Sequence, residues 1–471
     1  MNVTNVQGKF GRVRFVNRVT ELDSLRRWWA ADQPRSAIVW GRRRTGKTVL
    51  LQEFARDLRS VFHTGAGRPT GGELAQLSRQ VAAAQLGGRR DLAAVPYRDW
   101  DDALDDLATL AEREPLLLIL DEFPEIVATS PALPGILRAF LDRAHGHTRL
   151  RLLLCGSAVR HMDALQEHRA PLYGRFDLTL PIHPFNPAEA ALMLPDLAPL
   201  DRATVYGLAG GMPLYLSWWD QATPLAENLR RLVCRPAAPL LMEGQLVLAT
   251  EVEHGGLAAA VLHAIAAGRT RYNEIKDWVR AEPSRTLDRL IELRLVERMV
   301  PVTETERSRR RTYRIADNFL AFYLGLVERF RPEIERGLGE SILPVLIEAL
   351  DDHQGAAWEA AFRDHVRRMA ANGDLGDGIV AVGSFWTDDG QNQIDAVALA
   401  GRARRPVFVG ESKWARTVSA PRIVADLHRK VGALPGGLPG AAEPALAVCA
   451  RERVLDLPED VRAVTADDIF G

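Results

Sequence analysis

The chain has 471 residues, 47% hydrophobic and 26% charged, with a formal net charge of −1, which is ordinary for a globular protein of two to four domains and excludes a uniformly basic nucleic-acid coat. Its three cysteines lack the spacing of a disulfide framework or a zinc site, which fits a reducing cytoplasm. No apolar run approaches 18 residues and the N-terminus lacks the apolar region of a signal peptide, so we expect a cytoplasmic protein that does not span a membrane.

Three short apolar segments in the first third of the chain predict buried strands. They are residues 36–40 (SAIVW), 116–120 (LLLIL) and 150–155 (LRLLLC), and residues 48–58 are expected to form the helix after the first. Strands that alternate with helical stretches imply a parallel sheet with helices on its faces. Ligands bind such α/β sheets at the carboxyl ends of the strands, and the motifs of this region lie there.

A glycine-rich segment with the pattern of a phosphate-binding loop follows the first of these strands. The pattern GxxxxGK[ST] spans Gly41, Arg42, Arg43, Arg44, Thr45, Gly46, Lys47 and Thr48. Glycines allow backbone N–H groups to turn toward phosphates, and Lys47 can reach the β- and γ-oxygens. Thr48 is expected to hold Mg²⁺, and the N-terminus of the following helix favours an anion. The segment therefore predicts a site for ATP and Mg²⁺.

Acidic and polar residues follow the other two strands. Asp121 and Glu122 match a Walker B element, in which Asp121 orients Mg²⁺ through its water shell and Glu122 polarises the attacking water, so we expect hydrolysis as well as binding. Ser157 stands where sensor-1 residues occur, although a Gly-Ser turn is the alternative. Arg175 is a candidate arginine finger, supplied within the chain or to a neighbour in a homo-oligomer, and its alternative is a surface salt bridge.

From residue 187 the pattern becomes helical with short loops, which predicts a helical lid. Three helices (257–267, 272–280 and 284–293) and two strand-like segments (295–302 and 310–316) follow, in the order and lengths of a winged helix-turn-helix. Arginines gather on or near its third helix and between its strands, at Arg285, Arg289, Arg294, Arg307, Arg309, Arg310 and Arg311. Such residues suit contacts with nucleic-acid phosphates. A packing or oligomerisation role is the alternative.

The last 115 residues change character again. A helix (357–371), three strands (379–386, 393–399 and 405–411), a second helix (420–433) and a further strand (445–450) are predicted. This order resembles the core of restriction-endonuclease-like domains.

Asp395, Glu411 and Lys413 in this region match the pattern of a metal-dependent nuclease centre. Residues two apart on a strand share a face, so Glu411 and Lys413 point the same way, and Asp395 on the neighbouring strand completes the group. Glu359 on the preceding helix is a further candidate ligand. Carboxylates suit Mg²⁺, which would activate water for phosphodiester attack. Only five of the 60 lysines and arginines are lysines, which favours a specific role for Lys413. The alternatives are a solvated hairpin and a DNA-binding domain without activity.

Together these residues resemble the prokaryotic "archaeal ATPase" family of AAA-type proteins. The resemblance rests on FVNRVTEL (15–22), GRRRTGKT (41–48), LILDEFPEI (118–126), LLLCGS (152–157), PLYGR (171–175), GGMPLYL (210–216) and IADNFLAFY (315–323). It implies an ATPase core and a winged helix, with a C-terminal restriction-endonuclease-like module of the kind that members often carry. One departure is Asn17, where the family more often has glycine before Arg18.

The sequence thus predicts an α/β chain: a P-loop NTPase parallel sheet with a helical lid, a winged helix-turn-helix, and an α/β restriction-endonuclease-like domain. The expected boundaries are 1–186 for the ATPase core, 187–250 for the lid, 251–330 for the winged helix with its following helix, 331–355 for a helical linker and 356–471 for the nuclease-like domain. We expect an ATP-hydrolysing protein that acts on nucleic acid, DNA in the first instance. The alternative is a nucleotide-switched regulator that binds DNA or protein without cleaving.

Overall fold

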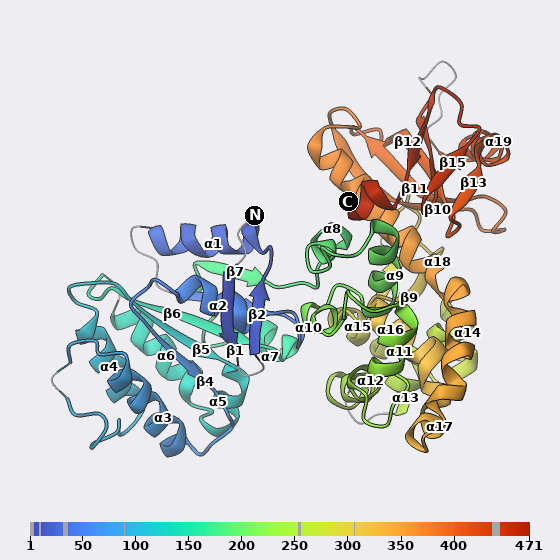
Figure 1. Cartoon of the computed structure of the whole chain (residues 1–471). Helices are drawn as coiled ribbons and strands as arrows, with labels where there is room; N and C mark the ends of the chain where they lie inside the picture. The colour runs from blue at the N-terminus through green and yellow to red at the C-terminus, as the bar shows by residue number, and fades with distance from the viewer. Residues whose placement is uncertain are drawn as a thin grey trace. The chain divides into compact units, whose positions relative to one another are not determined.

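The computed structural model describes residues 4–8, 11–31, 36–88, 90–144, 146–252, 256–305, 307–435 and 443–471. The chain divides into two units, residues 1–184 (unit 1) and residues 185–471 (unit 2) (Figure 1). The finer domain boundaries drawn from the sequence stay predictions.

A five-stranded parallel sheet forms the centre of unit 1. Its strands stand in the order β4-β5-β6-β3-β7. They are β3 (Ser36–Trp40), β4 (Ser60–Thr64), β5 (Leu116–Asp121), β6 (Leu150–Gly156) and β7 (Leu178–Pro181). The three apolar strands predicted from the sequence are confirmed. Since β5, β6 and β3 are neighbours and parallel, the residues that follow them come together at one edge of the sheet.

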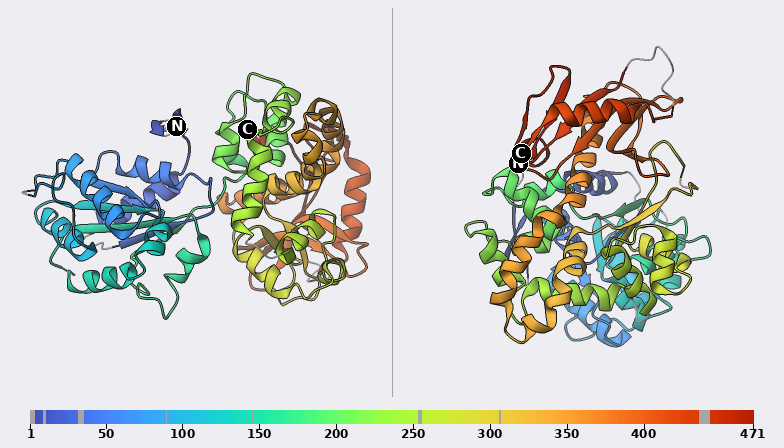
Figure 2. Two further views of the ribbon diagram at one scale, coloured as in Figure 1. Left: turned by 90° about the horizontal axis from the view of Figure 1, so that it is seen from below. Right: turned by 90° about the vertical axis from the view of Figure 1, so that its right-hand side faces the viewer.

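Alternate residues along these strands pack into two hydrophobic cores, one on each face of the sheet. Helices cover both faces (Figures 1 and 2). Leu118 contributes to one core and Ile119 to the other. The first core includes α3 (Thr70–Ala83), α4 (Trp100–Leu110), α5 (Phe123–Thr129), α6 (Leu133–Arg143) and α7 (Val159–Ala164), and the second includes α1 (Val19–Ala30) and α2 (Lys47–Ala55). A hairpin of β1 (Thr4–Gly8) and β2 (Gly11–Phe15) precedes α1.

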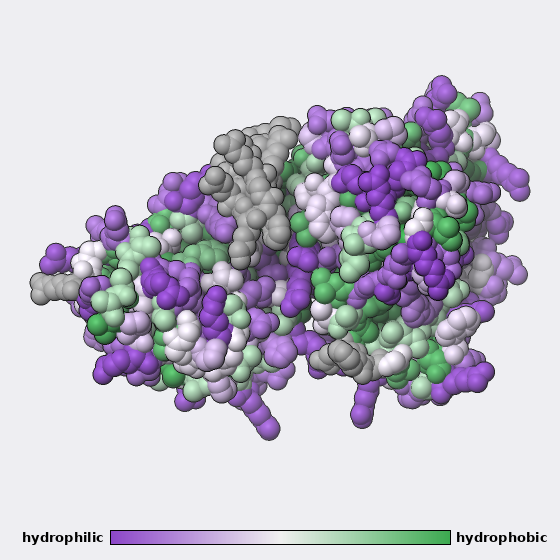
Figure 3. Space-filling view, turned by 60° about the horizontal axis from the view of Figure 1, so that its bottom comes forward, coloured by the Kyte–Doolittle hydropathy of each residue, from purple (hydrophilic) through white to green (hydrophobic). Residues whose placement is uncertain are grey.

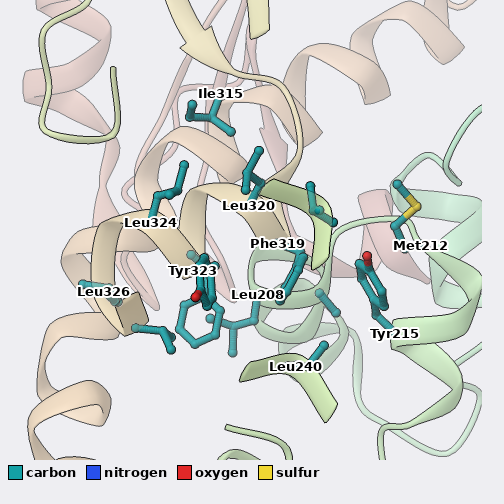
Figure 4. Close-up of a cluster of buried hydrophobic side chains, with 14 of the residues drawn as sticks. Leu208, Met212, Tyr215, Leu240, Ile315, Phe319, Leu320, Tyr323, Leu324 and Leu326 are labelled. Carbon is teal, nitrogen blue, oxygen red and sulfur yellow. The ribbon is translucent and has the colours of Figure 1, made fainter. Parts of the chain in front are cut away.

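Unit 2 begins with short helices that share one large core with the helices and strands that follow them up to Leu350. They are α8 (Pro187–Ala191), α9 (Pro199–Ala209), α10 (Pro213–Ser217), α11 (Leu225–Leu232) and α12 (Pro239–Glu251). Figure 4 shows Met212 and Tyr215 beside Phe319 in this core. Gly211 meets the backbone of Phe185 so closely that an added Cβ would lie 1.8 Å from its carbonyl oxygen. The Gly-Met-Pro segment is thus a packed turn that starts α10.

The winged-helix prediction matches the elements of the next segment. The helices are α13 (Gly256–Ala266), α14 (Tyr272–Val279) and α15 (Ser284–Glu292), and the antiparallel strands are β8 (Val296–Met299) and β9 (Thr312–Ile315). The helix expected to follow the winged helix, up to residue 330, is divided: α16 (Asn318–Phe322), a π-helical turn (Tyr323–Val327) and a 3₁₀ turn (Glu328–Phe330), with α17 (Arg331–Glu335) after it.

One helix of 34 residues, α18 (Gly339–Asn372), leads into the C-terminal sheet. The sequence predicted a helical linker and a separate helix from residue 357. Pro344 lies inside α18 only a turn and a half from its start, where few backbone hydrogen bonds are lost, so the helix continues through it.

The C-terminal sheet has the order β10-β11-β12-β14-β16. Its strands are β10 (Ile379–Trp386), β11 (Gln393–Ala400), β12 (Arg405–Ser412), β14 (Ala445–Cys449) and β16 (Val461–Val464). The first three are antiparallel and the last three are parallel. The core on one face includes α18 and α20 (Ala466–Phe470), and that on the other includes α19 (Ala420–Val431). A short parallel pair, β13 (Thr417–Ser419) and β15 (Arg453–Leu455), lies outside this sheet.

Residues 300–311, between β8 and β9, are called the wing. The wing packs against β10, the edge strand of the C-terminal sheet: the Val302 N–H donates to Ser384 O at 2.8 Å, and the Val302 side chain belongs to the same core as Phe385. Arg310 pairs with Glu304 and also donates to Trp386 O at 3.2 Å. A covered edge cannot pair with another chain.

Hydrophilic and hydrophobic residues are intermixed over the face seen in Figure 3. Among the described residues, no helix has both the length and the apolar character needed to cross a membrane.

Candidate functional site

The phosphate loop connects β3 to α2 at the carboxyl edge of the unit 1 sheet. Gly41 is required by a close approach, since a Cβ there would lie 2.2 Å from Ile182 O. Gly46 has a φ of 86°, in the left-handed region that glycine adopts without strain. Arg44 also has a positive φ, 71°. The two glycines of the motif are therefore both explained by the backbone of the loop.

Lys47 turns back onto its own loop. Its Nζ donates to Gly41 O at 2.8 Å and to Arg42 O at 2.9 Å, and the side chain is 6% exposed. Thr45, which is fully buried, donates through its hydroxyl to Arg42 O at 2.9 Å. Carbonyl oxygens that would repel an anion are thus held by cationic or polar groups.

Thr48 and Asp121 are brought together across two elements. The Thr48 hydroxyl donates to Asp121 Oδ2 at 2.9 Å, whereas no donor in the described part of the chain makes a hydrogen bond to the buried Asp121 Oδ1. Burial raises the pKa of Asp121, and the Cys155 thiol and Thr48 hydroxyl oppose this shift. A hydroxyl beside a buried carboxylate with one oxygen lacking a donor fits a hydrated Mg²⁺ ion.

Glu122 and Ser157 also come together. The Ser157 hydroxyl and backbone N–H donate to Glu122 Oε2 at 2.8 and 3.2 Å. Glu122 itself has a φ of 50°, which is uncommon for a residue other than glycine. The predicted sensor residue therefore holds the carboxylate of the predicted catalytic glutamate.

Arg175 lies away from this group. Its guanidinium forms two hydrogen bonds with Asp142, at 2.8 and 3.1 Å, and its carbonyl accepts from Ser36 Oγ at the start of β3. The phosphate loop begins at the other end of the same strand, about 13 Å away at a rise of 3.3 Å per residue. Arg175 is thus remote from the phosphate loop of its own chain and forms a salt bridge with Asp142, the alternative named in the sequence analysis. A finger supplied to a neighbouring copy stays a prediction.

Asp395 and Glu411 lie on neighbouring strands in unit 2, one residue beyond the paired Ala396 and Gly410. The two side chains are 5% and 8% exposed. A Cβ on Gly410 would lie 2.5 Å from the Phe362 ring of α18, so the residues next to it along the strand face α19. The two carboxylates therefore share the α19 face, and they are called the acidic centre together with the lysines that contact them.

Each oxygen of Glu411 accepts a hydrogen bond from a lysine. Lys413 Nζ lies 2.8 Å from Oε1 and Lys430 Nζ lies 3.1 Å from Oε2. Lys430 comes from α19, is 7% exposed, and also pairs with Asp426 at 3.0 Å. Glu411 is thus neutralised by residues of this chain.

Asp395 Oδ2 accepts from the N–H and hydroxyl of Ser412, at 2.8 and 3.1 Å. Burial, followed by the charge of Glu411, raises the pKa of Asp395. Glu359 comes from α18, which packs on the other face of the sheet, and burial followed by Asp395 raises its pKa to about 7. Over the described ranges, no three His, Cys, Asp or Glu residues form a group that could hold a metal ion.

With the geometry in view, comparison with known proteins identifies the first domain. Residues 15–218 match the model of an ATPase domain that occurs predominantly in Archaea. This segment is therefore similar to an ATPase domain of that archaeal type. Residues 323–423 match a second family, archaeal and bacterial proteins of unknown function, and this segment contains Glu359, Asp395, Glu411 and Lys413.

Relatives agree with this assignment. An uncharacterized protein of Methanocaldococcus jannaschii is 24% identical over 424 residues, which cover 88% of this chain and 91% of that protein. An uncharacterized ATP-binding protein of the same organism is 47% identical over 45 residues, 10% of this chain and 76% of that protein. The fold resembles a Walker-type ATPase of Pyrococcus abyssi, with a TM-score of 0.53 and 18% identity over 66% of this chain and 96% of that one. Residues 15–218 thus form an ATPase domain of the kind that occurs predominantly in Archaea.

The arginines of the winged-helix segment differ in how they are used. Arg285 and Arg294, at the two ends of the third helix, are exposed, as are Arg307 and Arg309 in the wing. Arg310 is engaged with Glu304 and with the backbone of β10. The wing therefore both packs on the C-terminal sheet and presents exposed arginines.

Two site residues escaped the sequence analysis. Lys430 lies 19 residues from Glu411, and only the scarcity of lysine could have indicated it. Arg18 was noted as part of a motif, but its buried contacts with the phosphate loop depend on tertiary structure.

Proposed function

We propose that this protein hydrolyses ATP with Mg²⁺ and uses the nucleotide cycle to act on nucleic acid, with a C-terminal domain that cleaves it. The observation that carries the ATP-dependent part is the pairing of Thr48 with Asp121, whose second oxygen is buried without a hydrogen bond from the described residues. A buried, partly satisfied carboxylate is costly unless a ligand completes it.

In the proposed reaction, the phosphate loop binds the triphosphate through its N–H groups, and Lys47 leaves the loop carbonyls for the phosphates. Bound Mg²⁺ would neutralise the charge that develops on the phosphates. Thr48 and Asp121 would hold it. Glu122 orients the attacking water, and Ser157 fixes the direction of the Glu122 carboxylate through its two hydrogen bonds.

The proposed action on nucleic acid is supported by four exposed arginines: Arg307 and Arg309 in the wing, Arg285 on the third helix and Arg294 just after that helix. Such residues contact phosphates and give affinity without sequence specificity. DNA is the proposed polymer.

The proposed nuclease activity is supported by the position of Asp395, Glu411 and Lys413 at one end of two paired strands. Mg²⁺ held by the two carboxylates would supply a water molecule activated for phosphodiester attack. In this proposal Lys413 leaves Glu411 and stabilises the charge on the attacked phosphate, while Lys430 keeps its hydrogen bond to the other oxygen.

A second candidate function is that the C-terminal domain binds nucleic acid or protein without cleaving it. The observation that favours it is the pair of lysines on Glu411, which already neutralise the carboxylate that a metal ion would need.

One experiment tests both parts of the proposal. Wild-type and Glu122→Gln proteins are incubated with ATP and Mg²⁺, with and without DNA or RNA, and both phosphate release and nucleic-acid products are measured. We expect DNA to accelerate ATP hydrolysis by the wild type. We expect Glu122→Gln to bind ATP normally but to hydrolyse it at a rate at least roughly 100-fold lower than that of the wild type. Hydrolysis that ignores every nucleic acid would contradict the proposed target, and DNA binding without cleavage would favour the second candidate.

A further inference from the structure

Arg18 is a buried arginine at the start of α1 that contacts three separate parts of unit 1. Its side chain is 4% exposed. Nη1 donates to Glu21 Oε1 at 2.8 Å, and Nη2 donates to Thr45 O at 2.9 Å and to His183 O at 2.7 Å. Thr45 belongs to the phosphate loop, and His183 belongs to the segment between β7 and the end of unit 1 at Pro184.

The backbone beside this contact is strained. Asn17 and Arg18 have φ values of 61° and 57°, both in the left-handed region. Asparagine enters this region more readily than most residues, which explains how it replaces glycine at position 17, but arginine does not. Strain of this kind persists where surrounding contacts hold it, often at functional sites.

The hydrogen bond to Thr45 O has a consequence for the peptide that follows. In a planar trans peptide the C=O and N–H groups point in opposite directions. Because Arg18 holds Thr45 O, the Gly46 N–H points away from Arg18. Lys47 holds Gly41 O and Arg42 O in the same manner. These carbonyl oxygens of the loop therefore point toward the cationic side chains, and the N–H groups of the loop are left to bind an anion.

The segment after β7 is tied to both ends of the same loop. Ile182 N donates to Trp40 O at 2.6 Å, and Gly41 lies against Ile182 O. The next residue, His183, shares the guanidinium of Arg18 with Thr45. A shift of the Thr45–Gly46 peptide therefore changes the position of the donor that holds His183.

We propose that Arg18 is a positioning residue for ATP binding, which fixes the Thr45–Gly46 peptide and links the state of the phosphate loop to residues 182–183. This rests on the proposed nucleotide site. A guanidinium suits the role because its several fixed donors can reach two carbonyls and a carboxylate together, which a single ammonium at the end of a shorter side chain does not.

The test compares Arg18→Lys and Arg18→Met with Glu21→Gln, which removes the negative charge from the third contact of the guanidinium and leaves the loop contact intact. ATP affinity is measured by calorimetry, folding by the thermal unfolding midpoint without nucleotide, and hydrogen exchange in peptides that cover residues 178–190 with and without ATP. We expect ATP affinity to fall roughly 10- to 100-fold in both Arg18 variants and to change little in Glu21→Gln. ATP should slow exchange near His183 in the wild type and not in Arg18→Lys.

Wild-type ATP affinity in a folded Arg18→Lys protein would overturn the positioning role. An equal exchange response to ATP in the wild type and Arg18→Lys would overturn the link to residues 182–183. Absence of ATP binding by the wild type would refute the nucleotide site itself, and the Arg18 proposal with it, before any variant is considered.

Discussion

In the nucleotide site a buried aspartate has one oxygen without a hydrogen bond from the described residues, whereas in the acidic centre a buried glutamate has a lysine on each oxygen. Both sites lie at strand ends, and the nucleotide site contains one of the five lysines whereas the acidic centre contains two. They differ in what the lysine holds: Lys47 contacts carbonyls and Lys413 contacts a carboxylate. An ammonium leaves a neutral carbonyl at lower cost than it leaves a carboxylate.

This difference explains why the nucleotide site can accept a ligand more easily than the acidic centre can. In the nucleotide site Lys47 can turn to phosphates while Asp121 is still available to a cation. In the acidic centre, a metal ion has to compete with Lys413 for Glu411 Oε1, and Lys430 already occupies the other oxygen. In the nucleotide site, groups that can contact a ligand are held by neutral carbonyls or lack a hydrogen bond from the described residues, whereas in the acidic centre the lysines neutralise Glu411.

Removal of Lys47 should give the largest effect. We expect Lys47→Ala to lower ATP affinity roughly 100-fold or more, since charge-assisted contacts to phosphate are lost, while the carbonyls of the loop stay accessible to water. Calorimetric titration with ATP measures the loss, and circular dichroism checks that the protein is folded. If a folded Lys47→Ala protein binds ATP as tightly as the wild type, Lys47 does not contact the phosphates, and it would then not differ from Lys413 in its availability to a ligand.

Lys413 is expected to be sensitive to a change that keeps its charge. If the acidic centre cleaves DNA, Lys413→Arg should lower the rate roughly 100-fold, because the larger guanidinium cannot take the ammonium's place beside the attacked phosphate. Lys276→Arg is the matched control, since Lys276 is an exposed lysine paired with Glu282. Gel assays of DNA cleavage with Mg²⁺ measure both. Equal rates in Lys413→Arg and the control would show that Lys413 acts only as a counter-ion.

The sequence predicted the nucleotide site better than the acidic centre for a physical reason. Residues 41–48 are contiguous, so their glycines and lysine determine the loop locally. Asp121 ends an apolar strand that can be recognised from its own sequence, without knowing which strands lie beside it. In contrast, the Lys430 contact with Glu411 depends on how α19 packs on the sheet, and the remoteness of Arg175 depends on which end of β3 it meets.

The extent of longer elements was predicted less well for the same reason. The break predicted between residues 350 and 357 does not exist, because α18 continues through a polar stretch whose Gln354 is 1% exposed and donates to Thr204 O. The packing of the wing on β10 also joins residues more than 70 positions apart. Local patterns predict elements, whereas contacts of this kind require the assembled fold.

The smallest expected effect concerns the pH dependence of the free energy of unfolding, which reports whether Glu359 on α18 carries a proton in the folded protein. The pKa of Glu359 is raised from 4.5 to about 7. Below pH 4.5 the carboxyl is protonated in both folded and unfolded states. Between pH 4.5 and 7 the unfolded state ionises and the folded state keeps its proton, so stability falls as pH rises through this window. The side chain is 36% exposed, which reduces the effect to roughly 1–2 kcal/mol.

Glu359→Gln should remove this part of the pH dependence, because glutamine does not ionise, whereas Glu348→Gln, at an exposed position on the same helix, should leave it unchanged. Urea unfolding at pH 5, 6, 7 and 8 without divalent cations measures the free energy for all three proteins. If the wild type and Glu359→Gln lose stability in parallel from pH 5 to 7, Glu359 does not carry a proton in the folded protein. Burial and the charge of Asp395 would then not keep Glu359 protonated, and the contrast between the acidic centre and the nucleotide site would rest on their lysines alone.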